Sequence, residues 1–191
     1  MPPKIRITSE MIVDAGFEVI RETGVENMNA RTIAQKHGCS TQPVMYQFKK
    51  IEDIKKAVYQ KADTYHTEYI TNMGAGFSVL EMGLAYVRFG AVESNLFRFL
   101  FQSDMFDGKS LSNLIESEDL MPVIAPMSIQ TGLSIEQTRK LFRFVFLFAH
   151  GYASMFANNA MDYDEEIIKT DLKTAMAGMV TVWRENQDEE G

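Results

Sequence analysis

Apolar residues recur along this chain at the three- and four-residue spacing of amphipathic α-helices, and almost no stretch alternates as a strand would. Thr8 or Ser9 can cap the first such segment. The buried face of this helix is predicted to hold Ile12, Ala15, Gly16, Val19 and Ile20. Gly24 follows, and we expect it to end the helix in the left-handed conformation that glycine favours. The pattern therefore predicts an all-α protein.

Two short helices and one long helix are predicted next. Asn29 is suited to cap a helix that Gly38 ends, and Ser40 is suited to cap another that ends near Phe48. Pro43 fits the first turn of the second short helix, because a backbone N–H at that position has no partner within the helix. The long helix is expected from residue 51 or 52 to about residue 73.

The rest of the chain predicts further helices, about nine in all. Their expected ranges are about 77–92, 95–106, 110–120, 134–160 and 164–186. Ser134 forms a capping box with Gln137, and Asp164 can cap the last helix. The segments 107–108 and 122–132 are predicted to be looser connections.

Composition points to a protein that works inside the cell. The 191 residues include one cysteine, which cannot form an internal disulfide, and the chain shows no cleavable apolar leader. The longest apolar run, residues 142–156, is interrupted by Arg143 and His150 and is too short to cross a bilayer. We expect a cytoplasmic protein without a membrane partner.

The charge of the chain is unevenly distributed. The net charge is −7, but residues 1–65 carry ten Lys and Arg against eight Asp and Glu, hence +2, and residues 66–191 carry nine against eighteen, hence −9. Binding to phosphate depends on where the cations lie and not on the total. The asymmetry therefore predicts two different tasks for the two regions.

The two short helices, separated by Gly38, Cys39 and Ser40, form a helix-turn-helix pattern, whose second helix enters the major groove of DNA. Thr and Gln side chains can read base edges, and Tyr, Lys and Arg can contact phosphates. The predicted DNA-binding residues are Arg31, Ser40, Thr41, Gln42, Pro43, Tyr46, Lys49 and Lys50. From the spacing alone, an ordinary surface of a helical protein remains an alternative. Cys39 is interpreted as a small packing residue and not as a redox sensor.

Residues 8–60 resemble the TetR family of bacterial transcription regulators. The resemblance rests on the helix at 12–20 with Gly24, the stretch from Met28 to Ala34, the turn at 38–40, the aromatic-rich helix that closes on Phe48, and the acidic helix start at 52–54. The chain departs from the family at Met45, Gln47 and Ile51, where tyrosine, tyrosine or histidine, and a phosphate-binding lysine are usual.

The resemblance implies a domain organisation and a function. A helix-turn-helix domain would span residues 1–54, a helix at about 52–73 would connect it onward, and residues 74–191 would bind a ligand and dimerise. It implies a dimeric, nucleoid-associated repressor that a small apolar or aromatic effector releases from a palindromic double-stranded DNA operator. Alternatives are a constitutive dimeric DNA-binding protein without an effector, and a helical enzyme or carrier whose DNA-binding domain is no longer used.

The acidic region is rich in aromatic residues, with 11 of the 13 phenylalanines between residues 77 and 191. The resemblance implies an apolar ligand pocket in this region, and its predicted lining is Phe89, Phe97, Phe101, Phe146 and His150. The stretches 86–98 and 146–151 resemble the subgroup with a Trp, His, Gly signature, with Phe146 in place of the tryptophan. A purely structural role for the lone His150 remains open.

Small residues in the last two predicted helices suggest close helix packing. In the family these two helices form a four-helix dimer interface. The predicted interface residues are Ala149, Ala153, Ala157, Ala175, Gly178, Met179 and Val182. A homodimer also suits a palindromic operator, because each subunit reads one half-site.

No motif of an enzyme is present: we find no nucleophile elbow, no phosphate-binding loop and no metalloprotease motif. Three scattered histidines and one cysteine do not have the spacing of a metal site. We therefore expect neither catalysis, nor a metal, nor a cofactor.

Overall fold

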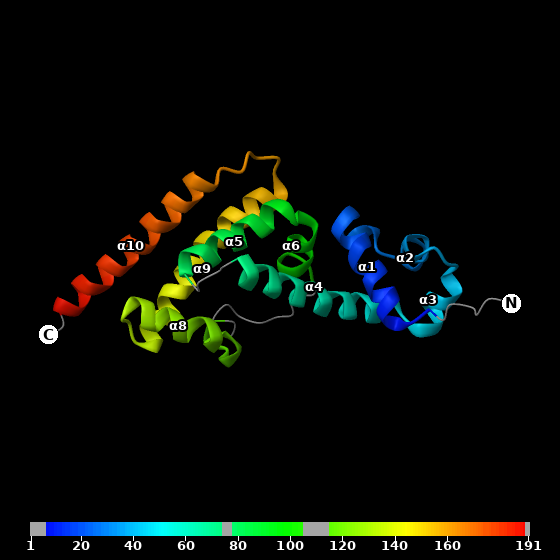
Figure 1. Cartoon of the computed structure of the whole chain (residues 1–191), viewed down its shortest axis with the longest axis horizontal. Helices are drawn as coiled ribbons and strands as arrows, with labels where there is room; N and C mark the ends of the chain where they lie inside the picture. The colour runs from blue at the N-terminus through cyan, green and yellow to red at the C-terminus, as the bar shows by residue number, and fades with distance from the viewer. Residues whose placement is uncertain (1–6, 74–77, 105–114, 190–191) are drawn as a thin grey trace. The chain divides into compact units, whose positions relative to one another are not determined.

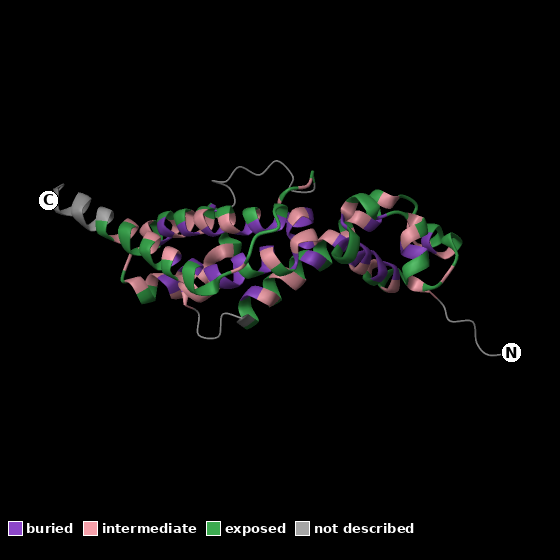
Figure 2. Ribbon diagram, turned by 90° about the horizontal axis from the view of Figure 1, so that it is seen from above, coloured by how far each residue is buried: buried purple, intermediate pink, exposed green. Residues whose placement is uncertain are grey.

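The computed structural model describes residues 7–73, 78–104 and 115–189, and these ranges contain nine α-helices and two short 3-10 helices but no strand (Figure 1). The predicted all-α fold is therefore confirmed. The chain divides into two compact units: a first unit of Met1–Thr67 and Glu93–Asp107, and a second unit of Glu68–Val92 and Gly108–Gly191. Buried positions recur along the helices of each unit (Figure 2), and in α5 they include Gly83–Val87, Phe89 and Gly90.

The first unit contains α1 (Ser9–Thr23), α2 (Ala30–His37), α3 (Thr41–Gln47), most of α4 (Ile51–Met73) and α6 (Ser94–Phe101). As predicted, Thr8 caps α1, because its hydroxyl accepts a hydrogen bond from the Met11 N–H at 3.2 Å. The core of this unit includes Ile12, Ile20, Ile33, Val44, Ile54, Val58, Phe97 and Phe99, all 0% exposed.

Gly24 ends α1, but not in the predicted left-handed conformation. Its φ is 89° and its ψ is 160°, so φ is positive while ψ is extended. This geometry turns the chain directly into a 3-10 helix, Val25–Asn27, instead of closing a left-handed cap. The sequence thus predicted that α1 ends at Gly24. It did not predict the conformation of Gly24, which the turn that follows requires.

The second unit contains α5 (Val79–Val92), α8 (Met121–Thr131), α9 (Ile135–Asn158) and α10 (Glu165–Glu189), besides the 3-10 helix Glu118–Leu120. The capping box of Ser134 and Gln137 is present as predicted. Asp164 accepts from the N–H groups of Glu166 and Ile167 at 3.1 and 3.2 Å, which confirms it as the cap of α10.

The predicted loose connection at 122–132 is wrong, because most of this segment forms α8. Pro122 lies in the first turn, where it removes no helical hydrogen bond, whereas Pro126 lies inside the helix. Ile124 is 0% and Met127 is 1% exposed, so their burial outweighs the bond lost at Pro126. Gly132 then ends the helix at a φ of 70°.

Two predicted helices have different bounds. The helix expected at 95–106 is α6, which ends at Phe101. In the stretch expected at 110–120, residues 115–116 are helical and a 3-10 helix follows at Glu118–Leu120, while residues 110–114 lie outside the described ranges.

Helices α5 and α9 pack closely together in the second unit. A Cβ built on Gly90 would lie 2.7 Å from the Cβ and carbonyl oxygen of Ala153 and 2.8 Å from its Cα. The backbones therefore approach to a distance that only glycine at position 90 permits. None of the helices in the described ranges is long and apolar enough to cross a membrane.

Candidate nucleic-acid interface

The helix-turn-helix is built by local hydrogen bonds. The Asn29 side chain accepts from the N–H groups of Arg31 and Thr32 at 3.0 and 3.1 Å, and the Thr32 hydroxyl accepts from the Asn29 N–H at 3.0 Å. Gly38 ends α2, as predicted, and its φ of 78° and ψ of 35° lie in the left-handed region. Such a tight cap at each end gives α2 a defined length and fixes where the chain turns toward α3.

Ser40 occupies the N-cap position of α3, but its side chain makes no capping hydrogen bond, contrary to expectation. Pro43 lies in the first turn of α3, as predicted. Val44 is 0% exposed and packs α3 inward. The helix is thus positioned by this apolar contact and by the turn, which leaves the Ser40 hydroxyl exposed to solvent.

The outer face of α3 carries the residues that the sequence predicted. Thr41 and Gln42 are exposed, and Tyr46 is 83% exposed. A tyrosine this exposed on a short helix buries almost none of its ring within the chain. Its ring and hydroxyl are therefore available to a partner such as DNA.

The predicted phosphate-binding cations are not neutralised by carboxylates of the described residues. Arg31, Lys49 and Lys50 are exposed and make no ion pair within the described ranges. By contrast, Lys36 and Lys61 pair with carboxylates on α1 at 2.5 and 2.7 Å. The free charges thus flank α3, where a DNA backbone would supply the missing anions.

The three residues that depart from the family pattern lie in different environments. Met45 is 43% exposed on the outer face of α3, and Ile51 is half-buried at the start of α4. Gln47 donates a hydrogen bond from Nε2 to the carbonyl of Ile7 at 2.8 Å. This side chain therefore holds the segment before α1.

A part-buried ion pair joins α1 to the start of α6 within the first unit. Glu93, 6% exposed, accepts from Arg21 Nε at 2.9 Å, from Arg21 Nη2 at 2.5 Å and from the Tyr65 hydroxyl at 3.0 Å. The hydrogen bond to Glu93 raises the pKa of Arg21 above its ordinary value, although burial opposes this. The sequence contained no signal for this contact, because Arg21 and Glu93 are 72 residues apart.

The predicted ligand-lining residues fall in two groups. Phe97 and Phe101 belong to the first unit, and their ring centroids are 5.1 Å apart. The ring centroid of Phe101 also lies 5.2 Å from that of His66. Burial lowers the pKa of His66 to about 4, so this ring is neutral at pH 7.

Phe89, Phe146 and His150 belong to the second unit. Phe89 is 0% exposed, and Phe146 and His150 are half-buried with ring centroids 5.6 Å apart. The Nδ1 atom of His150 lies 2.9 Å from the hydroxyl of buried Tyr86, and burial lowers the pKa of this histidine. His150 thus forms a neutral hydrogen-bonded pair with Tyr86 inside the unit.

The predicted dimer residues differ in exposure. Ala149, Ala153 and Ala157 are at most 3% exposed, and Ala153 packs on Gly90 of α5 in the same chain. Gly178 is exposed with open space around it, Ala175 and Met179 are half-buried, and the side chain of Val182 lies outside the described part. The close alanine spacing on α9 therefore reflects packing within one chain.

No group of three or more His, Cys, Asp or Glu in the described ranges is placed to hold a metal ion. No model of a known protein family matches the chain. A protein of Bacillus subtilis (strain 168) described as the uncharacterized HTH-type transcriptional regulator YobS is 20% identical over 188 residues, which cover 94% of this chain and 96% of that protein.

A solved structure also resembles this one. The multidrug binding protein EbrR, in complex with imidazole, aligns with a TM-score of 0.53 and 17% identity over 87% of this chain and 88% of EbrR. This likeness shows a common all-helical fold. Together with the helix-turn-helix geometry, the likeness to YobS over nearly the whole length of both chains supports a DNA-binding regulator and not an enzyme.

Proposed function

We propose that this protein is a TetR-like transcriptional repressor that binds a palindromic operator as a homodimer in the cytoplasm and leaves it when a small apolar or aromatic effector binds. The observation that carries the proposal is the outer face of α3. It presents exposed Thr41, Gln42 and Tyr46 between cations that make no ion pair within the described ranges. The similarity to YobS supports this interpretation.

Base readout and phosphate binding are assigned to different residues in this proposal. Gln42 can form a bidentate pair with adenine, and we expect Gln42→Ala to weaken binding to the preferred site by about 10- to 100-fold while non-specific binding persists. Lys50 contacts phosphate, so Lys50→Gln should weaken binding to every sequence and reduce the salt slope by about one.

The test begins with selection of a preferred site from a random DNA pool, followed by anisotropy titrations at several salt concentrations. Lys173→Gln is the matched control, because Lys173 is an exposed lysine on α10 and does not belong to the helix-turn-helix unit. If the pool yields no preferred site, or if the Gln42 and Lys50 variants bind as the unchanged protein does, α3 is not the reading helix.

The dimer is proposed to form through the outward face of α9 and the adjoining face of α10. Phe144, Leu147 and Met155 lie at helical spacing on α9 and are 44%, 44% and 49% exposed. Three large apolar side chains this exposed on one face are suited to cover a second copy of the chain. Gly178 on α10 would let the two copies approach closely.

Replacing Leu147 or Gly178 with glutamate is expected to produce a monomer in analytical ultracentrifugation, because each change places a charge in an apolar interface. The monomer should bind a palindromic site at least about tenfold more weakly, since it contacts one half-site at a time. Ile129→Glu is the control: Ile129 is 84% exposed on α8 and is expected to leave the dimer intact. A dimer that survives both changes would show that the interface lies elsewhere.

Release by an effector requires that the ligand bind the non-DNA-binding arrangement more tightly than the DNA-binding one. The aromatic side chains of the second unit support a site of this kind. Phe146, half-buried beside the His150 and Tyr86 pair, provides an apolar surface next to hydrogen-bonding groups.

A further inference from the structure

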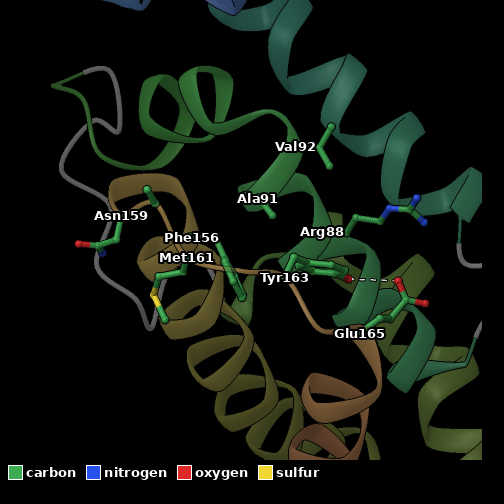
Figure 3. Close-up of a pocket in the computed structure, with 9 residues that line it drawn as sticks. Arg88, Ala91, Val92, Phe156, Asn159, Met161, Tyr163 and Glu165 are labelled. Carbon is green, nitrogen blue, oxygen red and sulfur yellow. Dashed lines mark hydrogen bonds between the residues drawn. The ribbon is translucent and has the colours of Figure 1, made fainter.

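A pocket of about 430 Å³ lies in the second unit, where the end of α5, the end of α9 and the connection to α10 meet (Figure 3). This volume falls in the range of about 300–1,000 Å³ that small-molecule sites occupy. Its larger apolar lining residues are Val92, Phe156, Met161 and Tyr163, and its polar ones are Arg88, Asn159 and Glu165. None of these positions was among the predicted site residues.

Two apolar residues of this pocket are largely exposed to solvent. Val92 is 63% and Met161 is 47% exposed, although both are large apolar side chains. Phe156 is 9% exposed, and its ring centroid lies 5.5 Å from that of Tyr163. A ligand with an apolar body would cover the two exposed side chains and rest on the two rings, at a gain of about 25 cal/mol for each Å² removed from water.

The acidic group in the pocket, Glu165, has a hydrogen-bond partner. The Tyr163 hydroxyl donates a hydrogen bond to Glu165 Oε2 at 3.2 Å. Burial, with the nearby Glu165 charge, raises the pKa of Tyr163 to about 12, so the hydroxyl remains a donor at pH 7. Glu165 is also the first residue of α10, where the helix dipole favours a negative charge.

The basic group in the pocket, Arg88, has no carboxylate partner in the described ranges. Arg88 makes no hydrogen bond and no ion pair with any residue in the described ranges. A guanidinium presents two parallel N–H donors that match a carboxylate. The lining therefore supplies an apolar surface and one cation without an ion pair in the described ranges, and its single carboxylate accepts a hydrogen bond from Tyr163.

We propose that this pocket binds a small organic acid with an apolar or aromatic body. The carboxylate pairs with the guanidinium of Arg88, and the body lies against Val92, Met161 and Phe156. The proposal goes beyond the regulatory function, because it requires neither DNA nor a dimer and concerns residues outside the predicted effector lining.

Three probes of the same shape and different charge test this proposal: 2-naphthoate, 2-naphthalenemethanol and 2-naphthylmethylamine. Each is titrated into the full chain without DNA by isothermal calorimetry. The acid is expected to bind at least about tenfold more tightly than the alcohol, as a charge-assisted hydrogen-bonded pair provides, and the amine more weakly than the acid.

Variants then locate the site. Arg88→Gln should reduce the affinity for 2-naphthoate by about tenfold and leave that for the alcohol unchanged. Lys173→Gln, which removes an exposed cation of the same unit outside the pocket lining, should change neither affinity. Ala160→Phe fills the pocket from an exposed position in the connection and should abolish binding of all three probes.

The proposal is overturned by equal affinity for the acid and the alcohol, by an Arg88→Gln variant that binds the acid as the unchanged protein does, or by the absence of saturable binding. Circular dichroism of the variants shows that the fold is retained. DNA binding is measured separately, so a failure of this site leaves the regulatory proposal standing, and the reverse also holds.

Discussion

Replacing Gly90 with alanine is expected to destabilise the protein by about 2 kcal/mol in denaturant-induced unfolding. In a helix this change is ordinarily stabilising by about 0.5–1 kcal/mol, because alanine loses less backbone entropy than glycine on folding. Here the sign is reversed, because the new Cβ would lie 2.7 Å from the backbone oxygen of Ala153 and 2.8 Å from its Cα. A backbone cannot rotate away as a flexible side chain can, so α5 and α9 must move apart.

Gly83 provides the control in the same helix. A Cβ built there would meet only Leu172 side-chain atoms, at 3.6 and 3.7 Å, which are ordinary contacts. Gly83→Ala should therefore stabilise the protein by up to about 1 kcal/mol. Adding Ala153→Gly to the Gly90 variant should restore only part of the loss, since the backbone contacts remain. Equal effects at positions 83 and 90 would contradict the close approach of α5 and α9.

Replacing Arg21 with methionine is expected to cost about 3 kcal/mol of unfolding free energy. Glu93 is 6% exposed, so the change leaves a buried carboxylate without its cation. The Tyr65 hydroxyl is then its remaining partner in this network. Glu93→Gln should cost less, about 2 kcal/mol, because Arg21 is 39% exposed and can be hydrated when its partner loses its charge. Chemical denaturation of both variants measures these costs.

The double variant measures the interaction energy between Arg21 and Glu93 apart from their other contacts. If Arg21 and Glu93 stabilise the fold through each other, the cost of both changes together should fall short of the sum of the single costs. Lys61→Met is the matched control, since the ion pair of Lys61 with Asp14 also involves α1, but the two side chains are 42% and 52% exposed. Its loss should cost less than about 1 kcal/mol. Additive costs at Arg21 and Glu93 would contradict the coupling.

The ion pair also connects α6 with the helix that supports the helix-turn-helix. Arg21 lies in the last turn of α1, the helix on which α2 and α3 pack, and Glu93 precedes α6. The ion pair therefore fixes the start of α6 to the helix-turn-helix within one compact unit. An arrangement of this kind restricts how far α1 can shift while α6 stays in place.

Helix ends were predictable wherever the signal is local. Asn29 with Gly38, and Ser134 with Gln137, lie within a few residues of the backbone groups that they satisfy, so their identities alone indicate the ends of α2 and the start of α9. The outer face of α3 was also predictable, because a short helix with one buried position, Val44, has its other side chains directed outward.

Predictions failed where a distant contact outweighed a local preference. Pro126 argued for a connection, but the burial of Ile124 and Met127 against other helices stabilises α8 in spite of it. The alanines of α9 signalled close packing, yet their spacing did not reveal the partner, which is Gly90 of α5 for Ala153.

The sequence by itself determined the helical class, most helix ends, the uneven charge and the residues that α3 presents, because each depends on neighbours within about two turns of helix. Only the tertiary structure decided which buried faces meet, which carboxylate pairs with Arg21, and that residues of α5, the end of α9 and the connection before α10 line one pocket. A periodic pattern indicates that one face of a helix is buried. The hydrophobic effect is non-directional, so the pattern does not specify which other helix covers that face.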